Sequence, residues 1–83
     1  MIFHWEDENQ AHIARHGISE FQAEAAFQAE DATVFPDAAR LNRWVLEATV
    51  EDRTLKVAFA RVFPEGFRVI TAHWMSPKRR RTP

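Results

Sequence analysis

Residues 55–75 decide the fold: they read LKVAFARVFPEGFRVITAHWM, two alternating runs on either side of a short segment with proline and glycine. In each run apolar residues recur at about every second position, which is the period of a half-buried strand. Proline and glycine in segment 63–66 are typical of a turn. We therefore predict a β-hairpin with strands at about 55–63 and 67–75.

Direct pairing up to that turn fixes which residues of the two strands lie opposite each other. It puts Lys56 opposite His73 on one face, and Arg61 opposite Arg68 on the other, mostly apolar face, which we expect under helices. Two opposed arginines are unfavourable unless an anion or a carboxylate lies between them. A β-bulge would shift this register by one residue and move side chains to the other face.

Further strands are expected on the N-terminal side of the hairpin. Residues 43–50 alternate between apolar and polar side chains, and a turn at 51–53 joins them to the hairpin. Residues 33–35 form a short extended piece that ends at Pro36. Residues 2–5 are predicted to form another short strand.

Two helices are expected before these strands. Acidic residues 6–8 favour a helix N-terminus, and this helix should run to His16 and stop at Gly17 in the left-handed C-cap conformation. A capping box at 19–22 begins the second helix, which should continue to about Glu30.

The predicted order is β-α-α-β-β-β, a single α+β domain with two N-terminal helices packed on an antiparallel sheet. The 83 residues have room for one domain, and the lack of cysteine excludes disulfides and thiolate metal sites. No stretch is long enough to span a bilayer, and the N-terminus lacks the basic start and apolar run of a secretory signal. We expect a cytoplasmic protein without membrane contact.

The net charge of −1 conceals an asymmetry between the two halves of the chain. Residues 1–39 hold eight acids and one base, whereas residues 40–83 hold four acids and ten bases. Such an asymmetry favours contact of the basic half with a polyanion such as RNA. The alternative is that opposite charges mingle in the folded protein and cancel.

Arg68 and His73 are the candidates for chemistry on RNA. Cleavage by the RNA's own 2′-hydroxyl needs a base, an acid for the leaving oxygen and cations on the phosphate. Histidine transfers protons near neutral pH, and arginine clamps phosphate through two hydrogen bonds. The simpler interpretations are an ion pair of Arg68 with Glu65 or a helix carboxylate, and an ordinary exposed strand position for His73.

Three further features have two interpretations each. His12 and His16 are four residues apart and could share a metal ion, but the sequence offers no obvious third ligand. We therefore favour a structural role, in which His16 caps a helix C-terminus and His12 is half-buried against the second helix. The three tryptophans are expected in the core rather than stacked on bases. The basic run 78–81, flanked by prolines, is either a phosphate contact or a solvated tail.

Three segments together resemble the BrnT family of type II toxins, of the RelE/ParE-like superfamily: residues 5–9 (WEDEN), 12–19 (HIARHGIS) and 68–72 (RVITA). The resemblance covers nearly the whole chain. It implies a RelE-like fold and an endoribonuclease activity against mRNA, for which we expect neither a metal nor a cofactor. It also implies a cognate BrnA-type ribbon-helix-helix antitoxin, through which the complex would bind and repress its own promoter DNA.

The resemblance assigns the basic residues of the last strand and of the tail to RNA. Arg68 matches the family motif directly, and Arg80 matches an arginine of the family's tail. We expect both to be catalytic, with His73 as a proton-transfer group. The residues expected to bind RNA are Lys56, Arg61, Lys78, Arg79 and Arg81.

Three departures from the family pattern motivate an alternative function. His73 stands where the family usually has arginine, Arg79 stands where it usually has glutamate, and the tail ends at Pro83, short of a helix that many relatives carry. The leading hypothesis is a ribonuclease toxin. The alternative is a degenerate toxin that no longer cleaves RNA and acts as an antitoxin-binding transcriptional co-repressor. A third hypothesis is a small interaction domain with no nucleic-acid role.

Overall fold

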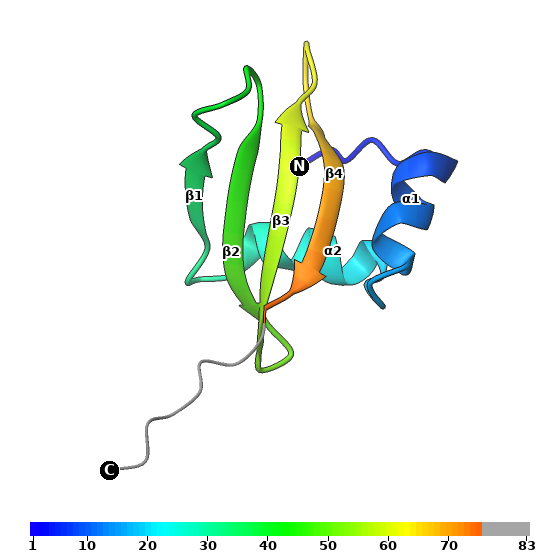
Figure 1. The fold of residues 1–83 in the computed structure, drawn as a ribbon, viewed down its shortest axis with the longest axis vertical. Coiled ribbons are helices and arrows are strands. Elements are labelled where there is room, and N and C mark those ends of the chain that lie inside the picture. Colours follow the sequence, from blue (N-terminus) through cyan, green and yellow to red (C-terminus); the bar gives the residue numbers. More distant parts are fainter. Residues whose placement is uncertain (76–83) are drawn as a thin grey trace.

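In a computed structural model that describes residues 1–75, two helices are followed by a four-stranded antiparallel sheet (Figure 1). The sheet has the order β1-β2-β3-β4, so neighbours in sequence are neighbours in space. The predicted α+β class, with two N-terminal helices on an antiparallel sheet, is confirmed. The elements are α1 (Asp7–Ala14), α2 (Glu20–Gln28), β1 (Thr33–Pro36), β2 (Trp44–Val50), β3 (Arg53–Arg61) and β4 (Phe67–Trp74).

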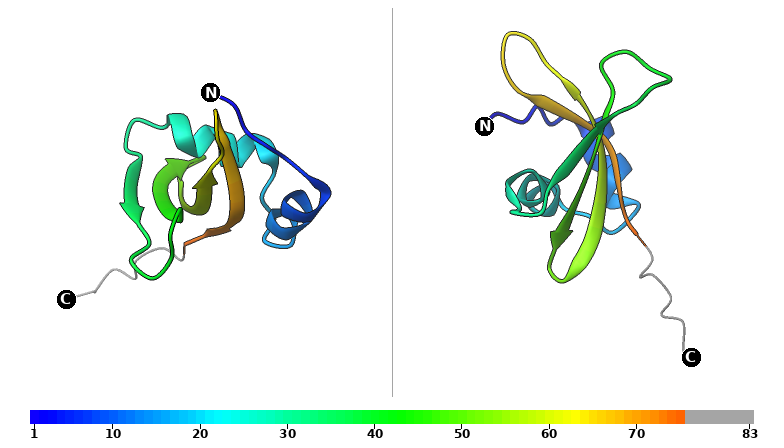
Figure 2. Two further views of the ribbon diagram at one scale, coloured as in Figure 1. Left: turned by 90° about the horizontal axis from the view of Figure 1, so that it is seen from above. Right: turned by 90° about the vertical axis from the view of Figure 1, so that its left-hand side faces the viewer.

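The helices occupy different places on the sheet. Helix α2 crosses one face and packs on β2 and β3, while α1 lies beside β4 (Figures 1 and 2). Ala23 and Ala26 of α2 are fully buried, and their small side chains allow the helix to approach the sheet closely. Within residues 1–75 no helix covers the opposite face, which we call the open face, and no helix is long and apolar enough to cross a membrane.

Local sequence signals set the helix ends. Gln22 N donates to Ser19 Oγ (3.1 Å) and Ser19 N donates to Gln22 Oε1 (3.0 Å), so the predicted capping box of α2 is confirmed. Gly17 has a φ of 71°, the predicted left-handed conformation, which reverses the chain after α1. Both helices end slightly earlier than predicted, at Ala14 and Gln28.

The predicted strand at residues 2–5 is reduced to a single bridge. Phe3 pairs in parallel with Phe67, flanked by two backbone hydrogen bonds of 2.8 and 2.9 Å. The chain then leaves the sheet at Trp5, whose indole Nε1 donates to Glu24 Oε2 on α2 (2.7 Å). This contact draws the segment toward α2, and the prediction of a full strand was therefore wrong.

The predicted extended piece at residues 33–35 is a strand of the sheet. Residues 33–36 form β1, which lies at the edge of the sheet. Val34 lies opposite Leu46 of β2. Just before β1, the carboxylate of Asp31 accepts hydrogen bonds from Thr49 Oγ1 (2.6 Å) and Thr49 N (3.0 Å). These bonds lower the pKa of Asp31 below its ordinary value, and they hold the start of β1 against β2.

The predicted register of the β3–β4 hairpin holds in one half and fails in the other. Lys56 lies opposite His73, as predicted. The predicted pairing of Arg61 with Arg68 is wrong, because a bulge next to Phe59 shifts the register by one residue. Beyond the bulge the partners are Phe59 with Val69, Ala60 with Arg68, and Arg61 with Phe67.

Burial explains the shift. Val69 is 1% exposed, and the ring of Phe67 lies 5.3 Å from that of Phe27 and 5.5 Å from that of Phe59. Burying a valine or phenylalanine side chain contributes about 1.5–3 kcal/mol. The predicted register would have turned Arg68 toward this apolar layer instead, and a buried guanidinium without a partner is unfavourable. The bulged register is therefore the more stable one.

The three tryptophans all pack against the core. Trp5, Trp44 and Trp74 are each partly buried there. The guanidinium of Arg53 lies 4.1 Å from the centroid of the Trp74 ring, a cation–π contact that covers the indole. The packing interpretation of the tryptophans is thereby confirmed.

Candidate functional site

The open face of the sheet carries two of the residues predicted to act on RNA. Lys56 of β3 and His73 of β4 are direct neighbours across the hairpin. Directly opposed residues have Cβ atoms about 4.5–5.5 Å apart. Glu47 of β2 is the partner of Lys56 on its other side. A row of three titratable side chains therefore crosses three strands.

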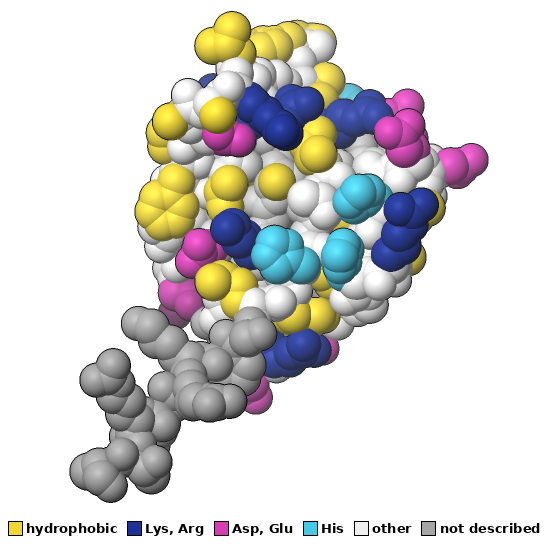
Figure 3. All heavy atoms as spheres, viewed as in Figure 1, with side chains coloured by type: hydrophobic (Ala, Val, Ile, Leu, Met, Phe, Trp, Pro, Cys, Tyr) yellow, Lys and Arg dark blue, Asp and Glu magenta, His cyan; other side chains and the backbone are white. Residues whose placement is uncertain are grey.

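Helix α1 and the turn that follows it add two histidines, His12 and His16, beside this row. The ring centroid of His16 lies 6.3 Å from that of His73 and 6.1 Å from that of His12. All three side chains are exposed. Figure 3 shows histidine side chains gathered on this face, with Lys and Arg side chains around them. Within residues 1–75, His4 is the histidine whose ring has a hydrogen bond, with Nε2 at 2.9 Å from Glu65 O.

The position of His12 corrects one prediction. We expected His12 to be half-buried against α2, but it is exposed, because α1 lies beside β4 instead of on α2. In the described part of the chain, no group of three or more His, Asp or Glu side chains is arranged to hold a metal ion.

Arg68 reaches the same face because of the bulge. It lies opposite Ala60, and its neighbours in β4, Phe67 and Val69, face the core, so its side chain is on the open face with that of His73. Its guanidinium forms an ion pair with Glu6, which precedes α1. The two side chains are 38% and 57% exposed, and exposed pairs of this kind contribute only about 0–1 kcal/mol, so another anion can compete with Glu6 for Arg68.

A continuous band joins these residues. Arg68 and His12 line the same hollow of about 60 Å³ between α1 and β4. In space, the ring of His16 lies next to that of His12, the ring of His73 lies next to that of His16, and Lys56 lies beside His73. We call Arg68, His12, His16, His73 and Lys56 the Arg-His-Lys band.

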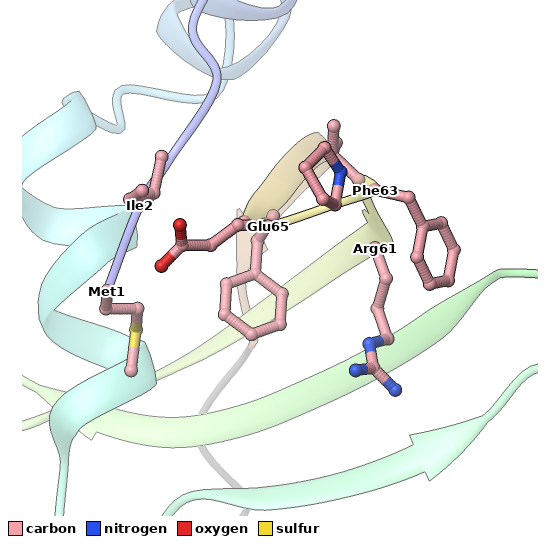
Figure 4. Close-up of a pocket in the computed structure, with 9 residues that line it drawn as sticks. Met1, Ile2, Arg61, Phe63 and Glu65 are labelled. Carbon is pink, nitrogen blue, oxygen red and sulfur yellow. The ribbon is translucent and has the colours of Figure 1, made fainter.

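Arg61 lies away from the band. Directly opposed residues of two strands lie on the same face, and Phe67, the partner of Arg61, faces α2. The sheet therefore separates Arg61 from the open face. Its guanidinium lies 6.0 Å from the ring of Phe63, and Arg61 is one of the residues that line an apolar groove of about 370 Å³. Figure 4 shows that the Glu65 carboxylate extends toward Met1, whereas the Arg61 side chain extends away from Glu65. The structure thus brings Lys56, but not Arg61, to the other predicted residues.

The remaining predicted residues lie outside the described part of the chain. Arg80, expected to be catalytic, is one of them. The others are Lys78, Arg79 and Arg81, which were expected to bind RNA. Their assignments stay predictions.

Sequence reasoning missed two residues near this face. His16 was interpreted as a helix cap; its four-residue spacing from His12 did signal a shared helix face, but not that this face meets β4. For Arg43, the sequence indicated only that it lies on the polar face of its strand. Its Nε is buried and has no hydrogen-bond partner in the described residues.

No protein-family model matches the chain, and no curated protein matches it either. Among solved structures, the chain is similar to the Brucella abortus ribonuclease toxin BrnT. The two are 26% identical in sequence, the match covers 92% of this chain and 95% of that chain, and the TM-score is 0.69. The resemblance to the BrnT family is confirmed. This chain therefore has the fold of a ribonuclease toxin.

Most residues of the BrnT-like N-terminal motif build the scaffold. Trp5 bonds to α2, Asn9 fastens α1 to β4, Gly17 reverses the chain and Ser19 caps α2. His12 and His16 differ from them, because their exposed rings lie in the Arg-His-Lys band. The motif therefore combines structural positions with two positions on the candidate site.

Proposed function

We propose that this chain is the toxin of a type II toxin–antitoxin system, an endoribonuclease that cleaves mRNA and so arrests growth. The Arg-His-Lys band supports the proposal: an imidazole, an amine and a guanidinium share one open face, in a fold similar to that of a ribonuclease toxin. These are the groups that cleavage by a 2′-hydroxyl requires.

Each residue of the proposed site has a separate task. Arg68, with Arg80 from the tail, neutralises the charge that develops on the scissile phosphate. His73 transfers a proton to or from the reacting oxygens. Lys56 lies beside His73 and binds a phosphate as a point charge. The proposed reaction uses no metal ion and no cofactor.

The rest of the proposed function concerns the partners. Lys78, Arg79 and Arg81 contact the RNA backbone beyond the band, and Arg61 contacts it only if the RNA wraps around the end of the sheet. A BrnA-type ribbon-helix-helix antitoxin neutralises the toxin in the cytoplasm. Promoter DNA is bound only through the antitoxin in the complex.

Induced expression without antitoxin is the direct test. Wild type should stop growth and fragment mRNA, and Arg68→Ala or His73→Ala should each lower the cleavage rate of the purified protein by about 10²–10³-fold, because each removes a group that acts in the transition state. Arg40→Ala, which removes an exposed arginine outside the band, is the matched control and should cleave normally. Healthy growth with intact transcripts would contradict the proposal.

One observation favours a second function. Arg68 is held by Glu6, as in the simpler interpretation of this arginine, and a persistent pair would keep the guanidinium from phosphate. We therefore keep the alternative of a degenerate toxin that binds antitoxin and acts as a co-repressor. It predicts a wild-type protein that cleaves no RNA yet raises the affinity of the antitoxin for operator DNA. In that case, Arg68→Ala should still repress the promoter together with the antitoxin.

A further inference from the structure

We propose that His16, in the turn after α1, is a second proton-transfer residue, which forms an acid–base pair with His73 of β4 for cleavage of the RNA chain. This inference rests on the function proposed above and names a further residue for it. It comes from the meeting of α1 with β4, which places two exposed imidazoles side by side.

The backbone on both sides of His16 is held in place. His16 N donates to Ile13 O (3.0 Å), and Gly17 N donates to Ala14 O (3.0 Å). Gly17 then reverses the chain with its left-handed φ of 71°. The backbone of His16 is therefore held by this turn, while its side chain is exposed to a ligand.

The separation of the two rings suits the reaction. In RNA cleavage the entering 2′-oxygen and the leaving 5′-oxygen lie on opposite sides of the phosphorus, roughly in line. Each needs a proton-transfer atom within about 2.6–3.2 Å. The centroids of His16 and His73 are 6.3 Å apart, so two rings with free rotamers can contact both oxygens of one phosphate.

We assign the base to His73, which lies on the sheet beside Lys56, and the acid to His16, which lies in the turn after α1. The other charged or titratable neighbours are His12, 6.1 Å from His16, Arg15 in the chain, and Glu47 beyond Lys56.

The proposed step balances without a further reactant. His73 takes the proton of the 2′-hydroxyl, and the 2′-oxygen forms a bond to phosphorus. The bond from phosphorus to the 5′-oxygen breaks, and His16 donates its proton to that oxygen. The products are a 2′,3′-cyclic phosphate and a 5′-hydroxyl, and solvent returns the two rings to their starting protonation states.

The test compares His16→Ala with Arg15→Ala in the full-length chain. Single-turnover cleavage of an RNA oligonucleotide should fall by about 10²–10⁴-fold in His16→Ala. Affinity for an uncleavable 2′-deoxy analogue should stay within about twofold, because the proton transfer acts in the transition state. Arg15→Ala removes a neighbouring charge but no imidazole, and should cleave at the wild-type rate. Added imidazole should restore part of the rate in His16→Ala.

The pH profile gives a readout that a structural role would not move. The wild-type rate should rise and then fall with pH, because the base must be neutral and the acid protonated. His16→Ala should lose the fall at high pH, and His73→Ala the rise at low pH. Glu47→Gln tests the carboxylate as a rival base, and should leave the profile unchanged.

The outcomes separate the two proposals. A wild-type chain that cleaves no RNA overturns the proposed function and this inference with it. A wild type that cleaves RNA while His16→Ala cleaves equally well overturns this inference alone. Loss of cleavage in His16→Ala together with an equal loss of affinity, and no rescue by imidazole, also overturns it, since His16 would then only bind or support the fold.

Discussion

Gly17 and Gly66, the two glycines of the chain, both have positive φ but lie in different surroundings. A Cβ at Gly17 would meet nothing within 4 Å. A Cβ at Gly66 would lie 2.6 Å from His4 Nε2 and 2.9 Å from Ile2 O. Ile2 O accepts a hydrogen bond from Phe67 N, so it cannot move away without weakening the bridge that ties the N-terminus to β4.

This difference predicts unequal losses of stability for the same substitution. Gly17→Ala should lower the free energy of unfolding by about 1–2 kcal/mol, the cost of a left-handed alanine. Gly66→Ala adds a backbone clash and should lower it by about 3 kcal/mol or more. Urea denaturation of both variants measures the difference. Equal losses would mean that the N-terminal segment does not pack on Gly66 in solution.

At the scale of elements, helix α1 is fastened to the sheet through Asn9, which is 4% exposed. Asn9 Nδ2 donates to Val69 O (3.0 Å) and to His4 O (3.2 Å), and Asn9 Oδ1 accepts from Glu6 N (2.7 Å). One side chain thus joins the start of α1, the N-terminal segment and β4. It also holds α1 where its histidines meet β4.

Removing this amide should loosen α1. Asn9→Ala should lower the free energy of unfolding by about 2–4 kcal/mol, because buried backbone groups lose their partners. Gln10 lies in the same helix, and its Nε2 donates to Glu20 Oε2 in a less buried contact. Gln10→Ala removes this contact and should lower the free energy of unfolding by about 1 kcal/mol or less. Thermal or urea denaturation measures both. Similar losses in the two variants would contradict the role of Asn9.

The start of α2, the chain reversal after α1 and the meander could be predicted because their signals are local. Ser19 with Gln22, and Gly17, act within one turn of the chain. The bulge could not be predicted in the same way. Val69 and Ile70 are both apolar and β-branched, so the alternation gives no preference between the two registers, and only packing on α2 decides.

The candidate site was predictable to the extent that it depends on one hairpin. Lys56 beside His73 follows from the half of the register that holds. Arg68 was expected on the wrong face, because its place depends on the bulge. The contribution of His16 depends on where α1 docks, which involves residues far apart in the sequence, and periodicity within one helix carries no information on it.

For the molecule as a whole, the opposite charges of the two halves meet at few points. In residues 1–75 one ion pair, Arg68 with Glu6, joins them. Glu47 and Lys56, both from the C-terminal half, are cross-strand neighbours. Four of the ten bases of residues 40–83 belong to the run 78–81. The basic half is therefore divided, with Lys56 and Arg68 on the open face, Arg61 on the other side of the sheet, and four bases in this run.

The division predicts how RNA affinity depends on salt. Each phosphate neutralised on a single strand contributes about 0.7 to the slope of log K against log salt concentration. A chain that ends at residue 77 lacks four bases, so its slope should be shallower by up to about 3. A chain that ends at residue 81 is the control and should keep the full slope. An unchanged slope after the larger truncation would exclude residues 78–81 from RNA binding.

The bulge in β4 also affects which changes of length the strand can accept. Ile70 is the residue without a partner, between Val69 opposite Phe59 and Thr71 opposite Ala58. Loss of its codon would join Val69 to Thr71 and leave every other side chain of the strand on its present face. Loss of the codon of Val69 or Thr71 would also remove the extra residue, since Ile70 would take the vacant place, whereas loss of the Ala72 codon would turn Thr71 toward the core. An in-frame deletion scan should therefore find its permissive positions at the bulge, residues 69–71, and the same positions are where an ancestral gene could gain or lose a codon without losing the site.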